Sequence, residues 1–392
     1  MKRTEGAAFV ATLGALLAMT AASNDIMVPA QPIIARAFAM PEAAGATMVG
    51  MFSIGYGAGL VIWGPLSDRF GRLTPLYLAT VGYILASAAC ALTDSFSVLV
   101  FGRFMQGFMG GVGPTLARAI SRDLGGGTRT AQALSGATVV QGVAPVFAPL
   151  LASALLIFLD WRSVFWALAV LGLTVLMSVK LFVPETLPPE KRSAPSIGQT
   201  GREMRVLMVT PGFLYGTAMV MSVFFGYMAL LGMGAAVTES VYELPPKWFG
   251  PVFTVNSVAY VLGAIVANRL AGRFGVSTII KGGALTAGAS GVFLLALSAM
   301  TPPLVVLWAG VVVYVFAFGT LLALCAARGL EPAGAIAGSA ATIMGLAQTL
   351  FSAAGIFMAA SLYDGSHRSL CWVMGASGVA LFLIWSKGRK YL

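Results

Sequence analysis

The sequence is dominated by long apolar runs that alternate with short polar segments. Twelve such runs occur, at approximately 8–34, 44–66, 73–92, 96–119, 132–157, 162–182, 211–236, 249–271, 277–298, 304–327, 334–361 and 368–386. A helix needs about 20 apolar residues to cross the hydrocarbon of a bilayer, and each run has about that length. Only 10% of the residues are charged, against about 25% in a soluble domain. The pattern predicts an all-α membrane protein with twelve transmembrane helices.

The basic residues predict how these helices are oriented. With both termini in the cytoplasm, nineteen Lys and Arg residues lie on the cytoplasmic side, four lie outside and Arg103 lies within a span. Lys and Arg accumulate in cytoplasmic loops, so the bias predicts cytoplasmic N and C termini in a bacterial inner membrane. The same placement explains the net charge of +10 without a nucleic acid partner. The cysteines lie in apolar runs without ligand spacing, and no metal site is expected.

The longest hydrophilic segment, residues 183–206, is rich in Pro, Ser, Gly and charge, which is typical of a linker. It divides the chain into an N-terminal six-helix bundle (1–187), a cytoplasmic linker (188–207) and a C-terminal six-helix bundle (208–392). The halves also resemble each other, because R-F-G follows the second helix of each half, in 64–73 and 268–277. Two related six-helix bundles are a transporter architecture.

Asp25 is an acid inside the first apolar run. A charge at the centre of a membrane helix costs roughly 2.5–3.5 kcal/mol, so such residues are usually functional. Arg103 lies in the fourth run, and counting about 1.5 Å per residue from the outer ends puts the two at similar depths. We therefore predict that Arg103 pairs with Asp25 and that Asp25 binds the proton that is exchanged during transport. In the alternative, Arg103 extends to the outer surface.

The segment GPLSDRFGRL follows the second run. Gly64 and Pro65 are expected to end that helix, and Gly71 permits a tight turn. The sharper interpretation is a cytoplasmic conformational latch, in which charged side chains pair with each other and with a helix end from the other half. The alternative is a solvated basic turn that only fixes topology. The latch residues are Gly64, Asp68, Arg69, Gly71 and Arg72.

The fifth run contains Pro145 and Pro149 beside Gly142, which predicts a bent helix that allows a neighbour to approach closely. Asn24 and Gln31 are seven residues apart and are predicted to share a face of the first helix. The Met- and aromatic-rich part of the seventh run is either ordinary packing or a pliable wall for a ligand. The substrate-cavity candidates are Asn24, Gln31, Gln106, Gln141, Phe224, Phe225, Tyr227, Asn256 and Gln348.

These motifs resemble the major facilitator superfamily. Its loop pattern G-x-L-x-D-R-x-G-R-[KR] is matched except at Leu73, and its R-x-x-Q-G-x-x-G pattern is matched from Arg103 to Gly110. The pattern D-x-x-x-P-A-x-P from Asp25 and the spacing A-P-x-x-A-P around Pro145 and Pro149 resemble the bicyclomycin and chloramphenicol resistance subgroup. The resemblance implies drug:proton antiport and a coupling role for Arg103.

The sequence contains no G-x-S-x-G motif, no paired histidines and no Walker loop, so neither an enzyme nor an ATP-driven pump is expected. We predict a monomeric secondary active transporter that exports amphipathic small molecules in exchange for protons by alternating access. It would need no cofactor beyond the proton gradient, and its partners would be substrate, protons and the lipid bilayer. The nearest alternative is an importer of a sugar or other metabolite on the same fold. A non-transporting membrane scaffold or sensor is more remote.

Overall fold

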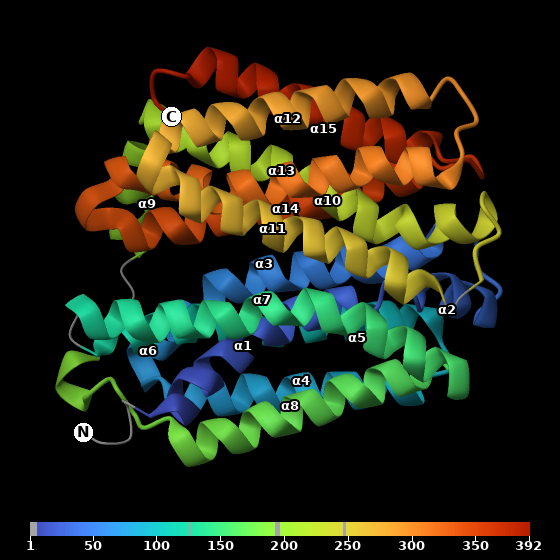
Figure 1. Cartoon of the computed structure of the whole chain (residues 1–392). Helices are drawn as coiled ribbons and strands as arrows, with labels where there is room; N and C mark the ends of the chain where they lie inside the picture. Colours follow the sequence, from blue (N-terminus) through green and yellow to red (C-terminus); the bar gives the residue numbers. More distant parts are fainter. Residues whose placement is uncertain (1–5, 125–126, 193–196, 246–247) are drawn as a thin grey trace. The chain divides into compact units, whose positions relative to one another are not determined.

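The computed structural model describes residues 6–124, 127–192, 197–245 and 248–392, and within these ranges the chain is almost entirely helical (Figure 1). The helices before the linker are α1 (Ala7–Asp25), α2 (Gln31–Ala37), α3 (Ala44–Phe70), α4 (Leu73–Leu92), α5 (Phe96–Gly110), α6 (Val112–Asp123), α7 (Gly127–Phe158) and α8 (Arg162–Phe182). Those after it are α9 (Ile197–Leu207), α10 (Pro211–Ser240), α11 (Phe249–Phe274), α12 (Val276–Leu297), α13 (Leu304–Leu330), α14 (Ala337–Ser361) and α15 (Arg368–Gly388). Short 3-10 helices cover Pro189–Lys191 and Glu331–Ile336.

Ten helices in the described ranges are long and apolar enough to cross a membrane. They agree with ten of the twelve predicted spans. The predicted span 96–119 comes as two helices, α5 and α6, which are separated at Gly111. The predicted span 132–157 lies inside α7, and the side chains of several of its residues are outside the described set. The predicted class of an all-α membrane protein is confirmed.

The first apolar run, 8–34, differs from the prediction because it is not one helix. α1 ends at Asp25, residues 26–30 form turns, and α2 begins at Gln31. Pro29 has no N–H to donate to the carbonyl of Asp25, four residues earlier, and Pro32 has none for the carbonyl of Val28. Pro29 therefore explains why α1 stops beside Asp25, the one acid of the run, whereas Pro32 lies in the first turn of α2, where a helix needs no N–H.

The chain forms two compact units. One contains Met1–Ala39 and Met51–Ser196, and the other contains Met40–Gly50 and Ile197–Leu392. The division after Ser196 falls inside the predicted linker 188–207, of which residues 193–196 lie outside the described ranges. Residues 40–50 belong to the second unit although they precede it in the sequence, so the contacts do not follow the sequence bounds strictly.

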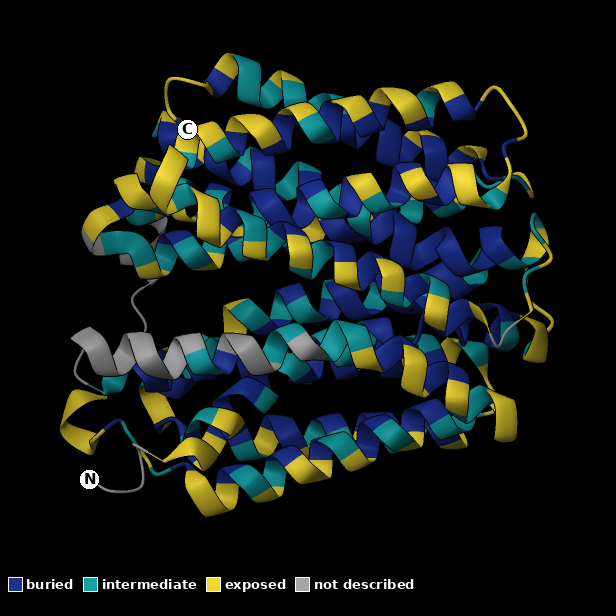
Figure 2. Cartoon of the chain, in the orientation of Figure 1, coloured by how far each residue is buried: buried dark blue, intermediate teal, exposed yellow. Residues whose placement is uncertain are grey.

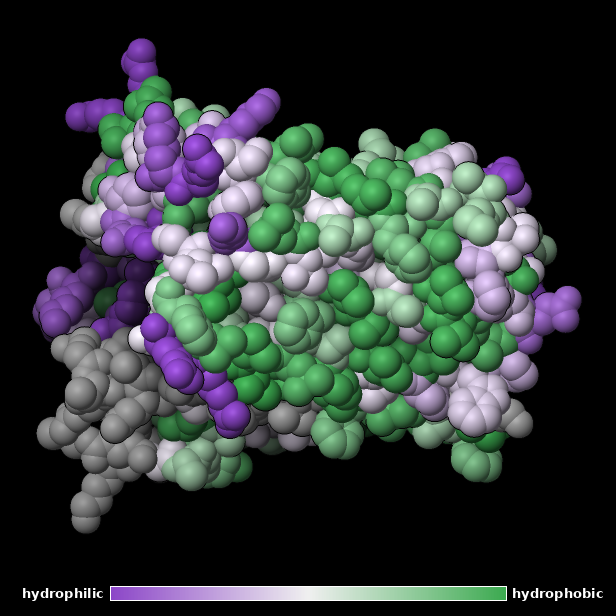
Figure 3. Space-filling model, turned by 45° about the horizontal axis from the view of Figure 1, so that its top comes forward, coloured by the Kyte–Doolittle hydropathy of each residue, from purple (hydrophilic) through white to green (hydrophobic). Residues whose placement is uncertain are grey.

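The helices carry apolar side chains outward and polar ones inward, as a bilayer requires. On α4, Leu78, Leu85 and Leu92 are spaced seven apart, and each is more than 60% exposed. Tyr83 and Ser87 are fully buried in the same helix. Figure 2 shows this alternation of exposed and buried residues along the helices. In Figure 3, hydrophobic residues cover the sides of the helices on the visible face, and hydrophilic residues gather at their ends.

Candidate functional site

The end of α1 leaves a backbone carbonyl without its helical donor. The N–H of Met27 bonds to the carbonyl of Asn24 at 3.1 Å, three residues back, where a regular helix would use Ser23, four back. The N–H of Ile26 bonds to Ala22 at 3.0 Å. The Ser23 carbonyl is therefore available to another element, just two residues before Asp25.

Arg103 of α5 occupies that carbonyl. Its guanidinium Nη2 donates to the Ser23 oxygen at 3.1 Å, and Nη1 donates to Gln106 Oε1 at 2.8 Å. The guanidinium carbon also lies 4.4 Å from the centroid of the Phe52 ring, a cation–π contact. The side chain is fully buried. A cation at the C-terminal end of a helix opposes the negative end of the helix dipole, so Arg103 stabilises the broken end of α1.

The predicted ion pair between Asp25 and Arg103 is not formed. Neither residue takes part in an ion pair with any described residue, and the guanidinium instead has neutral acceptors. Asp25 is only 6% exposed, and no described residue donates a hydrogen bond to its carboxyl group. An ionised carboxylate is costly when it is buried without a partner and lies at the C-terminal end of a helix. Uptake of a proton removes that cost.

A chain of buried hydrogen bonds extends from Arg103 across α4. Gln106 Nε2 donates to Ser87 Oγ at 2.7 Å, and Ser87 Oγ donates to the Tyr83 carbonyl at 2.8 Å. The Tyr83 hydroxyl meets Ser23 Oγ at 2.5 Å, and Ser23 Oγ bonds to the Met19 carbonyl at 2.6 Å. These contacts tie α1, α4 and α5 together. We call Ser23, Tyr83, Ser87, Arg103 and Gln106 the Arg103 network.

The network changes the interpretation of Gln106, which the sequence suggested as a cavity residue. Both ends of its amide are engaged and the side chain is fully buried, so it positions Arg103. Sequence reasoning missed Ser23, Tyr83 and Ser87. The available signal was polar side chains inside apolar runs, but Ser and Tyr are common there and only the fold selects these three.

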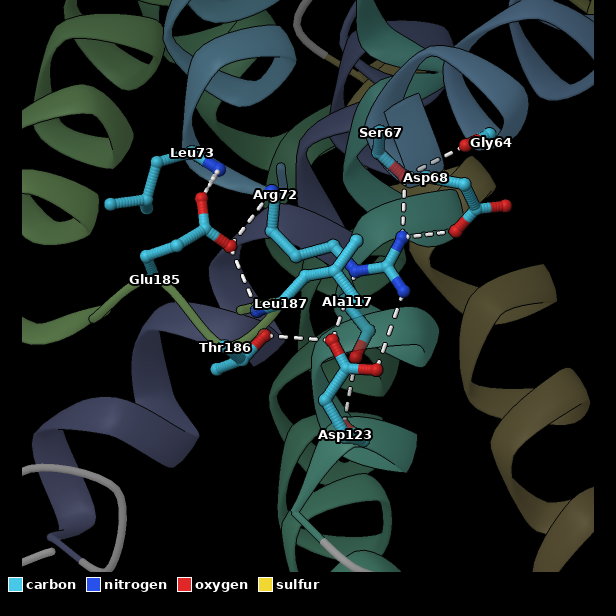
Figure 4. Close-up of polar contacts among 11 residues, drawn as sticks. Gly64, Ser67, Asp68, Arg72, Leu73, Ala117, Asp123, Glu185, Thr186 and Leu187 are labelled. Carbon is cyan, nitrogen blue, oxygen red and sulfur yellow. Dashed lines mark hydrogen bonds and ion pairs between the residues drawn. The ribbon is translucent and has the colours of Figure 1, made fainter. Parts of the chain in front are cut away.

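Arg72 is the centre of the predicted latch (Figure 4). Its guanidinium binds Asp68 at 2.6 Å and Ser67 at 2.7 Å, and it holds Asp123 at the end of α6 through Nε at 2.9 Å and Nη2 at 3.3 Å. Burial lowers the pKa of Arg72, but the hydrogen bonds and charges of Asp123 and Asp68 outweigh that effect and raise it above its usual value. All of these contacts lie within the first unit.

Glu185, after α8, caps the start of α4. Its carboxylate accepts the N–H groups of Arg72 at 2.9 Å, Leu73 at 3.1 Å and Leu187 at 2.9 Å, as Figure 4 shows. The first N–H groups of a helix lack internal acceptors and favour negative charge, so this carboxylate fits its place. Next to it, Thr186 donates to Asp123 at 2.8 Å. Glu185 and Thr186 thus belong to the same group of contacts as Arg72 and Asp123.

Gly71 has a φ of +91°, and a Cβ atom there would lie 2.7 Å from Glu185 Oε2. The tight turn expected at Gly71 is thus present. The expected helix end at Gly64 and Pro65 is wrong, because α3 continues to Phe70 with Pro65 inside it. The Gly64 carbonyl accepts the Ser67 hydroxyl at 2.8 Å. Arg69 is exposed and lies 5.2 Å from the centroid of the Phe70 ring.

In the predicted bend of the fifth run, Pro145 and Pro149 both lie inside α7, near Gln141 and Gly142. A Cβ at Gly142 would meet no atom within 4 Å, so close helix packing is not what requires glycine at this position. The bend itself stays a prediction.

The remaining cavity candidates are distributed over several helices. Asn24 lies near the end of α1 and Gln31 opens α2, so the predicted shared helix face is wrong. Phe224, Phe225 and Tyr227 are half-buried in α10, and Gln348 is half-buried in α14. Asn256 is buried in α11. Among the described residues, no group of three or more His, Cys, Asp or Glu residues could hold a metal ion.

Residues 12–360 match the family model described as Major Facilitator Superfamily. The chain is 26% identical to a bicyclomycin resistance protein homolog of Haemophilus influenzae, covering 97% of each chain. It is 27% identical to multidrug resistance protein D of Escherichia coli, covering 98% of this chain and 96% of the relative. A D-xylose–proton symporter of known structure matches with a TM-score of 0.74 at 19% identity over 96% of each chain, a likeness of fold alone. The protein is a multi-pass membrane transporter, and the chain belongs to the major facilitator superfamily.

Proposed function

We propose that this transporter exports amphipathic small molecules from the bacterial cytoplasm across the inner membrane, in exchange for protons. The observation that carries the proposal is Asp25, a carboxyl group buried at the broken end of a membrane helix without a partner among the described residues. The surroundings of such a group favour one of its protonation states, so a small rearrangement around it can make it bind or release a proton.

The names of the relatives support export. Two similar proteins are named for resistance to bicyclomycin and to multiple drugs. The motif around Asp25, with Pro29 and Pro32, also resembles the drug-resistance subgroup. The xylose symporter shares the fold but only 19% of its sequence, so it gives little support for a sugar importer.

In the proposed cycle, Asp25 takes up a proton when it is accessible from the outside, and it releases the proton when it is accessible from the cytoplasm. Arg103 keeps the end of α1 in place through its hydrogen bond to the Ser23 carbonyl. Substrate and proton compete, since a bound substrate changes the surroundings of α1. The two six-helix bundles rock to expose the site alternately.

Substrate contacts are proposed for the polar and aromatic side chains that are not used by the Arg103 network or the latch. They are Asn24, Gln31, Gln141, Phe224, Phe225, Tyr227, Asn256 and Gln348. We assign the mechanism no cofactor, and we propose that one monomer performs the whole cycle.

Transport in everted membrane vesicles tests the proposal. A proton gradient should drive uptake of a drug into vesicles with the wild-type protein, and drug addition should release protons. The Asp25→Asn variant should still exchange labelled drug for unlabelled drug but should not accumulate it. Proton-driven accumulation by Asp25→Asn at the wild-type rate would refute the assignment. Accumulation of sugars in whole cells, without drug export, would support the importer instead.

A further inference from the structure

Asn256 carries a buried amide that no described residue satisfies. The residue is 3% exposed in α11, and neither its Nδ2 nor its Oδ1 atom has a hydrogen-bond partner among the described residues. A primary amide offers two donors and one acceptor oxygen, and buried polar groups are nearly always satisfied. A buried amide without hydrogen bonds costs free energy compared with an apolar side chain of similar size. It points to a ligand that supplies the missing partners.

A cluster of aromatic rings lies one helical turn away. Phe318 of α13 is at its centre. The ring of Tyr227 is stacked on it at 4.4 Å with an interplanar angle of 10°, and that of Phe224 meets it edge-on at 5.0 Å. Tyr260 of α11 contacts the same ring at 5.2 Å. We call Phe224, Tyr227, Tyr260 and Phe318 the Phe318 cluster.

Asn256 and the Phe318 cluster are neighbours in the second unit. Asn256 and Tyr260 are four residues apart on α11, so their side chains project from the same helix face about 5–6 Å apart. Phe318 is buried, whereas Phe224, Tyr227 and Tyr260 are half-buried and offer ring surface to a ligand. The juxtaposition is a hydrogen-bonding amide beside a set of flat apolar surfaces.

The charges around the cluster define what the ligand can be. In α10, α11 and α13 the acidic and basic side chains lie near the helix ends, at Glu239, Arg269, Arg273 and Arg328. None lies within two helical turns of Asn256 in sequence. A charged ligand would therefore find no counter-ion on these helices, and burying its charge would be costly.

We propose that Asn256 and the Phe318 cluster bind an uncharged planar ring that carries a lactam or similar cis-amide edge. The ligand N–H donates to Asn256 Oδ1, its carbonyl accepts from Nδ2, and its ring packs against the exposed ring surface of the cluster. The paired donor and acceptor of Asn match such an edge in both directions. This assignment names a substrate class for the exporter and so rests on the proposed function.

The amide pairing gives a sharp selectivity. A site that is built for a hydrogen bond rejects an analogue that lacks it, because its own buried groups are then left unpaired. Stacking is less selective, since any flat ring can provide it. Blocking the ligand N–H should therefore cost at least about tenfold in affinity, the factor that corresponds to one buried hydrogen bond.

The test uses tritiated 2-quinolone, a flat neutral lactam, and its N-methyl derivative. Equilibrium binding to the purified full-length transporter is measured in nanodiscs without a gradient. The wild-type protein should bind 2-quinolone at least about tenfold more tightly than the N-methyl compound. Asn256→Leu should abolish this preference, because it weakens the binding of 2-quinolone and leaves the binding of the N-methyl compound unchanged. The matched control is Asn268→Leu, on the exposed side of α11, which should keep it.

A second variant keeps the inference testable if Asn256→Leu does not fold. Tyr227→Leu should weaken both compounds by a similar factor, because it removes stacking and not the amide pairing. An unchanged preference in Asn256→Leu, or no preference in the wild-type protein, would overturn the inference. If the preference is absent while proton-driven export is intact, only this substrate class fails. If Asp25→Asn exports normally while the preference is present, only the proposed coupling fails.

Discussion

Arg103 donates a hydrogen bond of 3.1 Å to the backbone carbonyl of Ser23, where α1 stops within the first apolar run. The contact replaces a helical bond that Met27 would otherwise supply. It makes the arginine a cap for a membrane helix and leaves the nearby Asp25 carboxyl group without an ion pair among the described residues. The two charged residues thus have separate structural roles.

A charge exchange tests this separation. If Arg103 acts as a cap, Asp25→Arg combined with Arg103→Asp should transport no better than either single variant, because aspartate cannot donate to Ser23 and Gln106. Arg103→Lys should lose at least about tenfold in transport, since an ammonium is not a planar fork. Uptake into everted vesicles measures both. Recovery of transport in the double variant would indicate a direct ion pair.

Pro29→Ala tests the helix break. The new N–H can bond to the carbonyl of Asp25 and extend α1 by a turn. The protein should keep its free energy of unfolding, while proton-driven transport should fall at least about tenfold because Asp25 and Ser23 lose their positions at a helix end. Pro32→Ala is the matched control. Pro32 lies in the first turn of α2, where a helix needs no N–H, so its loss should matter little. Equal effects of the two changes would argue against the break.

The latch should contribute to the stability of the first unit. Arg72→Met removes the charged partner of Asp123 and leaves a largely buried carboxylate with only the Thr186 hydroxyl, which should lower the free energy of unfolding by roughly 3 kcal/mol. Arg69→Met replaces an exposed arginine of the same segment and should change the free energy of unfolding little. Denaturant unfolding in detergent compares them. A similar loss in both variants would mean that net charge, not the Arg72 contacts, sets stability.

The two R-F-G turns provide a matched pair of glycines. Gly71 and Gly275 have φ values of +91° and +82°. A Cβ atom at Gly71 would lie 2.7 Å from Glu185 Oε2, whereas a Cβ atom at Gly275 would have no other atom within 4 Å. Each change to alanine should cost about 1–3 kcal/mol in backbone strain. Gly71→Ala should cost more, because it also displaces the cap of α4. Equal losses would show that Glu185 adjusts without cost.

The sequence predicted the class of fold because a bilayer leaves few choices. Apolar runs of about 20 residues must form helices, and basic loops orient them. Asp25 and Arg103 could be selected because charge inside a span is expensive. The R-F-G repeat marked equivalent turns, and both have a glycine with positive φ.

Other features depend on long-range contacts that no local pattern contains. Pro29 suggested the break only in retrospect, because proline is tolerated in many membrane helices, as Pro65 in α3 illustrates. The predicted pairing of Arg103 with Asp25 rested on their similar estimated depths in the membrane. Depth alone does not show whether the guanidinium binds the Asp25 carboxylate or a nearby backbone carbonyl that lacks its helical donor. Glu185 could not be assigned to the start of α4, since 112 positions separate it from Leu73.

Proton release on substrate binding tests the central claim most directly. A drug that the wild-type protein exports is added to purified transporter in weakly buffered solution, and the pH change is recorded beside the amount bound. The wild-type protein should release up to about one proton per bound drug, because only one buried carboxyl group is proposed to exchange it. Asp25→Asn should bind the drug and release none. Equal proton release from Asp25→Asn would contradict the assignment of Asp25 as the proton site.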